Sequence, residues 1–190
     1  MIAIRNERLS DAAAREALLD RAYGSARFTK SSARLRENRL PAEGLSFVAV
    51  DGRKLVGTAR LWNVSAGPGC PALLLGPLAV DPARQGHGIG AALMRHAIVA
   101  ARELGHRAVL LIGDAPYYSR FGFSAEQTGA LWMPGPYEQS RLLALELVPG
   151  ALEGARGLIG ATGAMAPKPD IAALISAERK AVNKRTPRAA

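Results

Sequence analysis

The sequence predicts an α/β fold in which one mixed β-sheet is flanked by helices. Residues 45–50 and 54–62 have the composition of β-strands and are joined by Asp51-Gly52, a dipeptide that tolerates positive φ and favours a tight antiparallel hairpin. Residues 72–80 and 108–112 are almost entirely apolar, as strands buried on both faces are. A helical pattern lies between these two strands, so a right-handed crossover makes them parallel neighbours.

Three elements are predicted before the hairpin. Residues 2–6 alternate enough to form an opening strand, and Ser10-Asp11 can cap a helix that ends near Gly24. A second short helix is predicted at residues 31–39. We interpret its arginines as a solvated helix face, with a substrate-binding role as the alternative; they are Arg34, Arg36 and Arg39.

The elements predicted after the hairpin are bounded by glycines. A helix follows Gly90 with leucine and alanine at helical spacing and stops at Gly105, a suitable residue beyond a helix end. A short helix follows Asp114 and ends at Gly122. Phe123 and residues 142–148 are predicted to complete the sheet as antiparallel strands, with a proline-broken loop before the second of them.

The composition indicates a soluble globular protein. The chain has 190 residues, of which 48% are hydrophobic, and its mean hydropathy is +0.03. The apolar runs are too short to span a membrane, and charged residues follow the first few positions too closely for a secretory leader, so a cytoplasmic location is expected. A single cysteine and three scattered histidines allow no internal disulfide and suggest no metal site.

Positive charge is concentrated partly in the last segment. The whole chain carries +9, and residues 151–190 hold seven basic and three acidic side chains, which gives this segment +4. No aromatic residue lies among these charges, so the stacking partners that single-stranded nucleic acid uses are missing, and we expect a solvated tail. The chain is therefore divided into a domain at residues 1–149 and an extension at 150–190, which is rich in Gly and Ala, then basic, with a helix predicted at 171–183.

The turn after strand 72–80 has the features of a phosphate-binding site. Gly86, Gly88 and Gly90 let the backbone approach a ligand closely, and the next helix points its unpaired N–H groups at the turn. A diphosphate suits such a site. The turn is not a P-loop, because no Lys-Ser or Lys-Thr follows the glycines, and it lacks the third glycine of a dinucleotide-binding turn.

Two motifs in this order resemble those of the GNAT superfamily of acyl-CoA-dependent N-acyltransferases. Gln85, Gly88 and Gly90 match its Q/R-x-x-G-x-G/A turn, and Tyr117 to Phe123 resemble its [FY]-Y-x-x-x-G-F segment. The resemblance covers residues 2–148. It implies a GNAT-type fold, with a mixed, mostly antiparallel central sheet, a splayed parallel pair and flanking helices, so residues 1–149 are identified as an N-acetyltransferase domain.

The resemblance also implies where acetyl-CoA, the expected cosubstrate, would bind. Strand backbone would pair with the pantetheine arm and the turn would hold the diphosphate, with Arg84 and His87 as further sources of positive charge. The expected cofactor-binding residues are Leu78, Ala79, Val80, Gln85, Gly86, His87, Gly88, Ile89 and Gly90.

Tyr118 matches the tyrosine that the family commonly places beside the leaving sulfur, so it is the expected catalytic residue. Tyr117 shares a helix face with Phe121, four residues later, and is expected in the core. The general base is left open. Asp114 stands where the family often has asparagine and equally suits a helix cap; Glu43 and Glu138 are further candidates.

The function that the resemblance implies is transfer of an acetyl group from acetyl-CoA to a primary amine by direct attack in a ternary complex. The expected partners are a small-molecule or peptide amine and no membrane, with nucleic acid not expected and a homodimer left open. The alternative is a non-catalytic acyl-CoA-binding module whose basic tail docks a partner.

Overall fold

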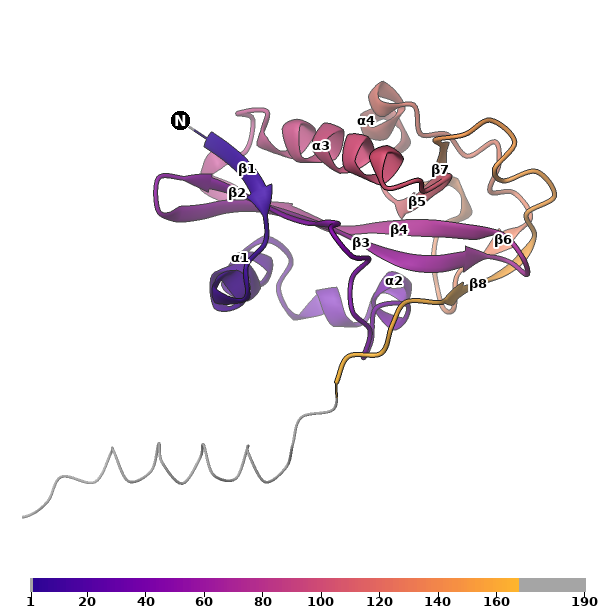
Figure 1. The fold of residues 1–190 in the computed structure, drawn as a ribbon, viewed down its shortest axis with the longest axis horizontal. Helices are drawn as coiled ribbons and strands as arrows, with labels where there is room; N and C mark the ends of the chain where they lie inside the picture. The colour runs from indigo at the N-terminus through magenta and orange to yellow at the C-terminus, as the bar shows by residue number, and fades with distance from the viewer. Residues whose placement is uncertain (1, 168–190) are drawn as a thin grey trace, which may run out of the picture.

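The computed structural model describes residues 2–167, which form one sheet with helices on both faces (Figure 1). The elements in chain order are β1 (Ile2–Asn6), α1 (Ala12–Tyr23), α2 (Ser31–Arg34), β2 (Ser46–Asp51), β3 (Lys54–Ala66), β4 (Pro71–Val80), α3 (Ile89–Glu103), β5 (Ala108–Ile112), α4 (Ala115–Tyr118), β6 (Leu131–Trp132), β7 (Leu142–Glu146) and β8 (Gly157–Ala161). The main path of the sheet runs β1-β2-β3-β4-β5-β7, and β8 pairs with both β3 and β6.

The predicted fold class is confirmed. Along the main path every pairing is antiparallel except β4 with β5, and a second, short parallel pair joins β6 and β8 at the edge. Helix α3 covers one face of the sheet, while α1 and α2 lie on the other (Figure 1). No helix within residues 2–167 has the length and apolar character needed to cross a membrane.

Alternating side chains of the central strands build the core on both faces. Leu73 of β4 and Val109 of β5 pack with Leu93 of α3, whereas Leu74 and Leu110 belong to a second cluster on the opposite face. This period-two pattern explains why both strands are apolar throughout, since each face is covered.

The parallel strands β4 and β5 separate soon after they pair. Their register includes only Leu73 with Val109 and Leu74 with Leu110, although β4 continues to Val80. On its other side β4 remains paired with β3, with an irregularity at which Gly76 and Pro77 together lie opposite Arg60. The strands therefore splay at their carboxyl ends, and the end of β4 lacks a strand neighbour on the β5 side within the described residues.

Several elements differ from the sequence prediction. Helix α2 ends at Arg34, well before residue 39, and the chain then turns at Asn38 with φ of 53°. Strand β3 extends to Ala66, and in place of the strand predicted at Phe123 there is only an isolated bridge between Ser124 and Ala144. These ends depend on pairing with distant segments, which local propensity does not encode.

Strand β8 was not predicted. It follows the domain boundary placed after residue 149 and contains two glycines, which weaken strand propensity. Its hydrogen-bond partners are β3, at Val64 to Ala66, and β6. The domain division itself stays a prediction, and the helix predicted at 171–183 lies outside the described residues.

Glu7 joins the first strand to both α1 and β3. Its side chain is only 6% exposed and accepts hydrogen bonds from Arg15 of α1 and, at 2.8 and 2.6 Å, from Nε and Nη2 of Arg60. The Glu7 backbone N–H also donates to the Ser46 carbonyl at 2.8 Å. This buried cluster fixes α1 against the sheet beside the splayed strands.

Candidate active site

The glycine turn leads directly into α3, as the sequence predicts. Gly86 and Gly88 have φ of 80° and 75°, a left-handed conformation that favours glycine, and Gly88 occupies the N-cap position of α3. The first intrahelical bond runs from the Ala92 N–H to the Gly88 carbonyl, so the helix offers no acceptor for the N–H groups of its first turn. These groups and the helix dipole favour an anion at this point.

A cavity of about 380 Å³ lies at this turn, between the end of β4 and the start of α3. Eight of the nine residues that the sequence assigns to cofactor binding line it; they are Leu78, Ala79, Val80, Gln85, Gly86, Gly88, Ile89 and Gly90. His87 is the exception: its side chain is exposed and its Nδ1 lies 2.9 Å from the Gln85 carbonyl. We call this the phosphate cavity; its ligand stays a prediction.

Two arginines line the phosphate cavity. Arg84 lines it and pairs with Asp51, with Nη2 and Oδ2 2.8 Å apart. Arg120, which the sequence analysis did not single out, lines it from the other side, with its guanidinium 4.5 Å from the centre of the Tyr117 ring. Arg120 lies inside the motif that contains Tyr118. A basic residue within a ligand-binding motif is a sequence signal that could have identified Arg120 as a binding residue.

A second cavity, the cleft cavity, opens where β4 and β5 splay and has a volume of about 570 Å³. Tyr23, Leu78 and Tyr117 line both this cavity and the phosphate cavity, so the two cavities adjoin. The cleft cavity also contains Tyr118 and the residues that end β5. A long ligand with its phosphates at the glycine turn can therefore extend along β4 towards Tyr118.

Tyr118 is held in the cleft by its neighbours. Its ring packs edge-on against Tyr117, with centroids 5.0 Å apart, and against Phe123 at 6.1 Å. A Cβ on Gly113 would lie 2.1 Å from Cε2 of Tyr118, so only glycine leaves room for the ring in this position. Burial, with smaller contributions from Tyr23 and Tyr117, raises the pKa of Tyr118 to about 12, which keeps its hydroxyl protonated at neutral pH.

The core position expected for Tyr117 is wrong. Tyr117 packs against Phe121 as expected, with centroids 5.7 Å apart, but it is half-buried and lines both cavities. Its hydroxyl lies 3.4 Å from where a Cβ on Gly90 would be. Tyr117 therefore lies between the glycine turn and Tyr118.

The three candidate bases are not equivalent. Asp114 occupies the N-cap position of α4, but its side chain makes no capping hydrogen bond, so the helix-cap alternative for its side chain is wrong. Asp114 and Glu138 both line the cleft cavity, whereas Glu43 is exposed and lines neither this cavity nor the phosphate cavity. Among residues 2–167 there is no cluster of three or more His, Cys, Asp or Glu side chains suited to hold a metal ion.

Tyr23, at the end of α1, was missed by the sequence analysis. Its hydroxyl donates a hydrogen bond to the Leu78 carbonyl, on the strand expected to pair with the cofactor. Burial raises the pKa of Tyr23, so the hydroxyl keeps the proton that it donates. A cofactor amide that binds this carbonyl has to share it with Tyr23 or displace it. Nothing local marks the last residue of a helix for this contact.

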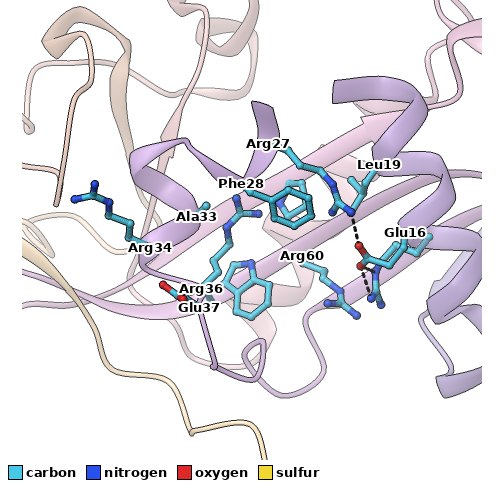
Figure 2. Close-up of a pocket in the computed structure, with 12 residues that line it drawn as sticks. Glu16, Leu19, Arg27, Phe28, Ala33, Arg34, Arg36, Glu37 and Arg60 are labelled. Carbon is cyan, nitrogen blue, oxygen red and sulfur yellow. Dashed lines mark hydrogen bonds and ion pairs between the residues drawn. The ribbon is translucent and has the colours of Figure 1, made fainter. Parts of the chain in front are cut away.

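A third cavity, of about 440 Å³, lies on the face covered by α1 and α2 (Figure 2). We call it the arginine cavity. It shares Arg27, Arg36 and Pro77 with the cleft cavity, so the two cavities adjoin. The solvated face predicted for the 31–39 segment is wrong for Arg36, which is half-buried and lines both cavities, and for Arg39, which donates to the Gly163 carbonyl at 2.6 Å; only Arg34 is exposed.

The comparisons with known proteins agree with this geometry. The acetyltransferase (GNAT) domain family matches residues 42–125. YhbS of Escherichia coli (strain K12), named as an uncharacterized N-acetyltransferase, is 32% identical over 158 residues, which are 82% of this chain and 93% of that protein. YjhQ of the same organism, also named as an uncharacterized N-acetyltransferase, is 42% identical over 64 residues, 34% of this chain and 35% of that protein.

Two solved structures are similar in fold and sequence. The crystal structure of the Escherichia coli YhbS protein in complex with CoA has a TM-score of 0.72 at 31% identity, over 85% of this chain and 89% of that chain. A GNAT family acetyltransferase from Brucella melitensis in complex with acetyl-CoA has a TM-score of 0.56 at 32% identity, over 76% of this chain and 96% of that chain. Because identity above 30% extends over most of the sequence and the fold is shared, the chain belongs to the GNAT family of N-acetyltransferases.

Proposed function

We propose that the protein transfers the acetyl group of acetyl-CoA to a primary amine by direct attack, with both substrates bound at once. The observation that carries this proposal is that the phosphate cavity and the cleft cavity adjoin and together extend from the glycine turn to Tyr118. The relatives solved with CoA and acetyl-CoA support the choice of cosubstrate.

In this proposal each part of the cleft has a separate task. The N–H groups at the start of α3, together with Arg120, bind the diphosphate. The free side of β4 beyond Leu75 aligns the pantetheine arm, so that the thioester lies in the cleft cavity. The amine attacks the thioester carbon, the C–S bond breaks, and the sulfur leaves as a thiolate.

Tyr118 stabilises that thiolate by donating a hydrogen bond. A thiol has an ordinary pKa of about 8.5, so complete proton transfer from a hydroxyl with a pKa of about 12 is uphill by about 5 kcal/mol. Tyr118 therefore acts by hydrogen bonding as charge develops on sulfur, and water completes protonation. Asp114 and Glu138, the two carboxylates that line the cleft cavity, are the candidates to accept the proton of the amine.

Thiol release tests the proposal against the non-catalytic alternative. The protein is incubated with acetyl-CoA and a panel of amines, and the free thiol released is measured with a thiol-reactive chromogenic reagent. CoA binding is measured separately by calorimetry. Cys70 is the only cysteine in the chain, so Cys70→Ser removes the background thiol. Amine-dependent thiol release supports the transferase, and tight CoA binding without release for any amine supports the binding module.

The pH dependence of kcat/KM is expected to have one limb. The rate rises with pH as the acceptor amine loses its proton, because only the neutral amine attacks. No falling limb follows up to about pH 10.5, because Tyr118, with a pKa of about 12, keeps its proton over this range. A falling limb between about pH 9 and 10, near the ordinary tyrosine value, would contradict the role given to Tyr118.

A further inference from the structure

Three of the five arginines around the arginine cavity are neutralised by carboxylates. Arg15 pairs with Glu7 and Glu16, Arg27 with Glu16 and Asp20, and Arg60 with Glu7. Figure 2 shows the Arg27 contact with Glu16 at one side of the cavity. These arginines have their charge partners within the protein and are not free to neutralise a ligand.

Arg34 and Arg36 have no carboxylate within ion-pair distance in the described part of the chain, and the two differ in burial. Arg34 is exposed and donates to the Pro134 carbonyl at 3.0 Å. Arg36 is half-buried, and burial, together with the nearby positive charges of Arg27 and Arg60, lowers the pKa of Arg36 to about 10. The guanidinium is thus still charged at neutral pH, in surroundings that disfavour its charge.

The terminal nitrogens of Arg36 have no hydrogen-bond partner among the described residues. Its Nε donates to the Ser32 carbonyl at 3.0 Å, and neither Nη atom donates to an acceptor within residues 2–167. The described residues contain no fully buried side-chain nitrogen without a partner, so the Nη atoms are partly exposed, and Arg36 lines both the arginine cavity and the cleft cavity. A guanidinium presented in this way binds a carboxylate through two parallel hydrogen bonds.

We propose that the acceptor amine carries a carboxylate, which Arg36 binds at the junction of the arginine cavity and the cleft cavity. This inference rests on the proposed transferase function. Three of the five arginines pair with Glu7, Glu16 and Asp20, and Arg34 is exposed, which leaves Arg36 as the one half-buried positive charge of the lining without a carboxylate partner in the described residues. A single charge matches a carboxylate better than a phosphate dianion. Leu19, Phe28 and Trp62 in the same lining provide apolar contacts for the body of the acceptor.

The test compares amino acids with the amines that lack only the carboxylate. The pairs are L-phenylalanine with phenethylamine and 4-aminobutyrate with propylamine, which place the amine at two distances from the carboxylate. Each is assayed by thiol release with the wild type, Arg36→Met and Arg36→Lys. Comparing variants on the same substrate removes the difference in basicity between the paired amines.

For at least one pair, Arg36→Met is expected to lower kcat/KM for the acid by about tenfold or more, because a charge-assisted hydrogen bond is lost. The effect on the matching amine stays within about twofold, and Arg36→Lys recovers part of the loss for the acid. Arg102→Met, at an exposed position of α3 outside the three cavities, leaves both members of each pair unchanged. Three results would overturn the inference. Arg36→Met could have equal effects on acid and amine in both pairs, or it could change only the KM for acetyl-CoA. Its effect on O-phosphoethanolamine as acceptor could also exceed its effect on the carboxylic acids.

A binding measurement separates this inference from the transferase function. In the presence of CoA, the acid of a pair should raise the unfolding temperature of the wild type but not of Arg36→Met, and the matching amine should raise neither. Thiol release without any Arg36-dependent preference leaves the transferase standing and overturns the carboxylate site. An Arg36-dependent shift in unfolding temperature without thiol release for any amine supports the carboxylate site and overturns the transferase function.

Discussion

Tyr118→Phe is expected to lower kcat by about 10²- to 10³-fold, the usual cost of removing one hydrogen-bond donor from developing charge. The phenyl ring can keep the edge-on contacts with Tyr117 and Phe123, so the fold and the shape of the cleft are retained. The dissociation constant for CoA should change by less than about twofold, because the glycine turn is untouched. Steady-state kinetics and calorimetry with CoA measure the two effects separately.

Tyr117→Phe is the matched comparison for this variant. The Tyr117 hydroxyl lies near Gly90 at the start of α3, so its loss should affect KM for acetyl-CoA and change kcat by less than about threefold. If Tyr118→Phe retains kcat within about threefold of the wild type, Tyr118 does not stabilise the leaving sulfur. If Tyr117→Phe has the larger effect on kcat, the roles of the two tyrosines are reversed.

Glu7→Gln is expected to lower the free energy of unfolding by about 3 kcal/mol, since it removes the charge that neutralises two largely buried arginines. The side chains of Arg15 and Arg60 are 10% and 18% exposed, so water cannot replace the carboxylate fully. For a chain of this size the unfolding temperature should fall by roughly 6 to 12 °C. Thermal and denaturant unfolding followed by circular dichroism provide the measurement.

Asp20→Asn is the control for Glu7→Gln. Asp20 pairs with Arg27 at 2.9 Å, but its side chain is 61% exposed. Its loss should cost less than about 1 kcal/mol, because solvent screens an exposed ion pair. Equal destabilisation by the two variants would show that the Glu7 cluster is not a distinct buried unit.

The parts of the site that the sequence predicted are those with local physical signals. Gly86 and Gly88 have left-handed backbones that glycine allows, and the helix that follows is amphipathic with a clear end at Gly105. Tyr118 lies in a motif whose neighbouring Gly113 is required by direct contact with its ring. Such constraints involve residues close in sequence, so a pattern reveals them.

The parts that were missed arise from contacts between distant segments. Strand β8 contains two glycines, and it is a strand because its backbone pairs with β3 and β6. Arg36 belongs to a basic run typical of a solvated helix, but α2 ends early and the side chain enters a cavity between α1, α2 and the sheet. The contact of Tyr23 with Leu78 joins residues 55 positions apart. Neither propensity nor spacing encodes these placements.

Among the three cavities described, the phosphate cavity and the arginine cavity share no lining residue, and each shares lining residues with the cleft cavity between them. Under the proposed function, the acyl donor would thus bind through the phosphate cavity and the acceptor through the arginine cavity, and the two would meet in the cleft cavity. CoA and the acetylated amine could then each dissociate without blocking the other. No covalent acetyl-enzyme would be needed to hold the acetyl group while CoA leaves and the amine binds.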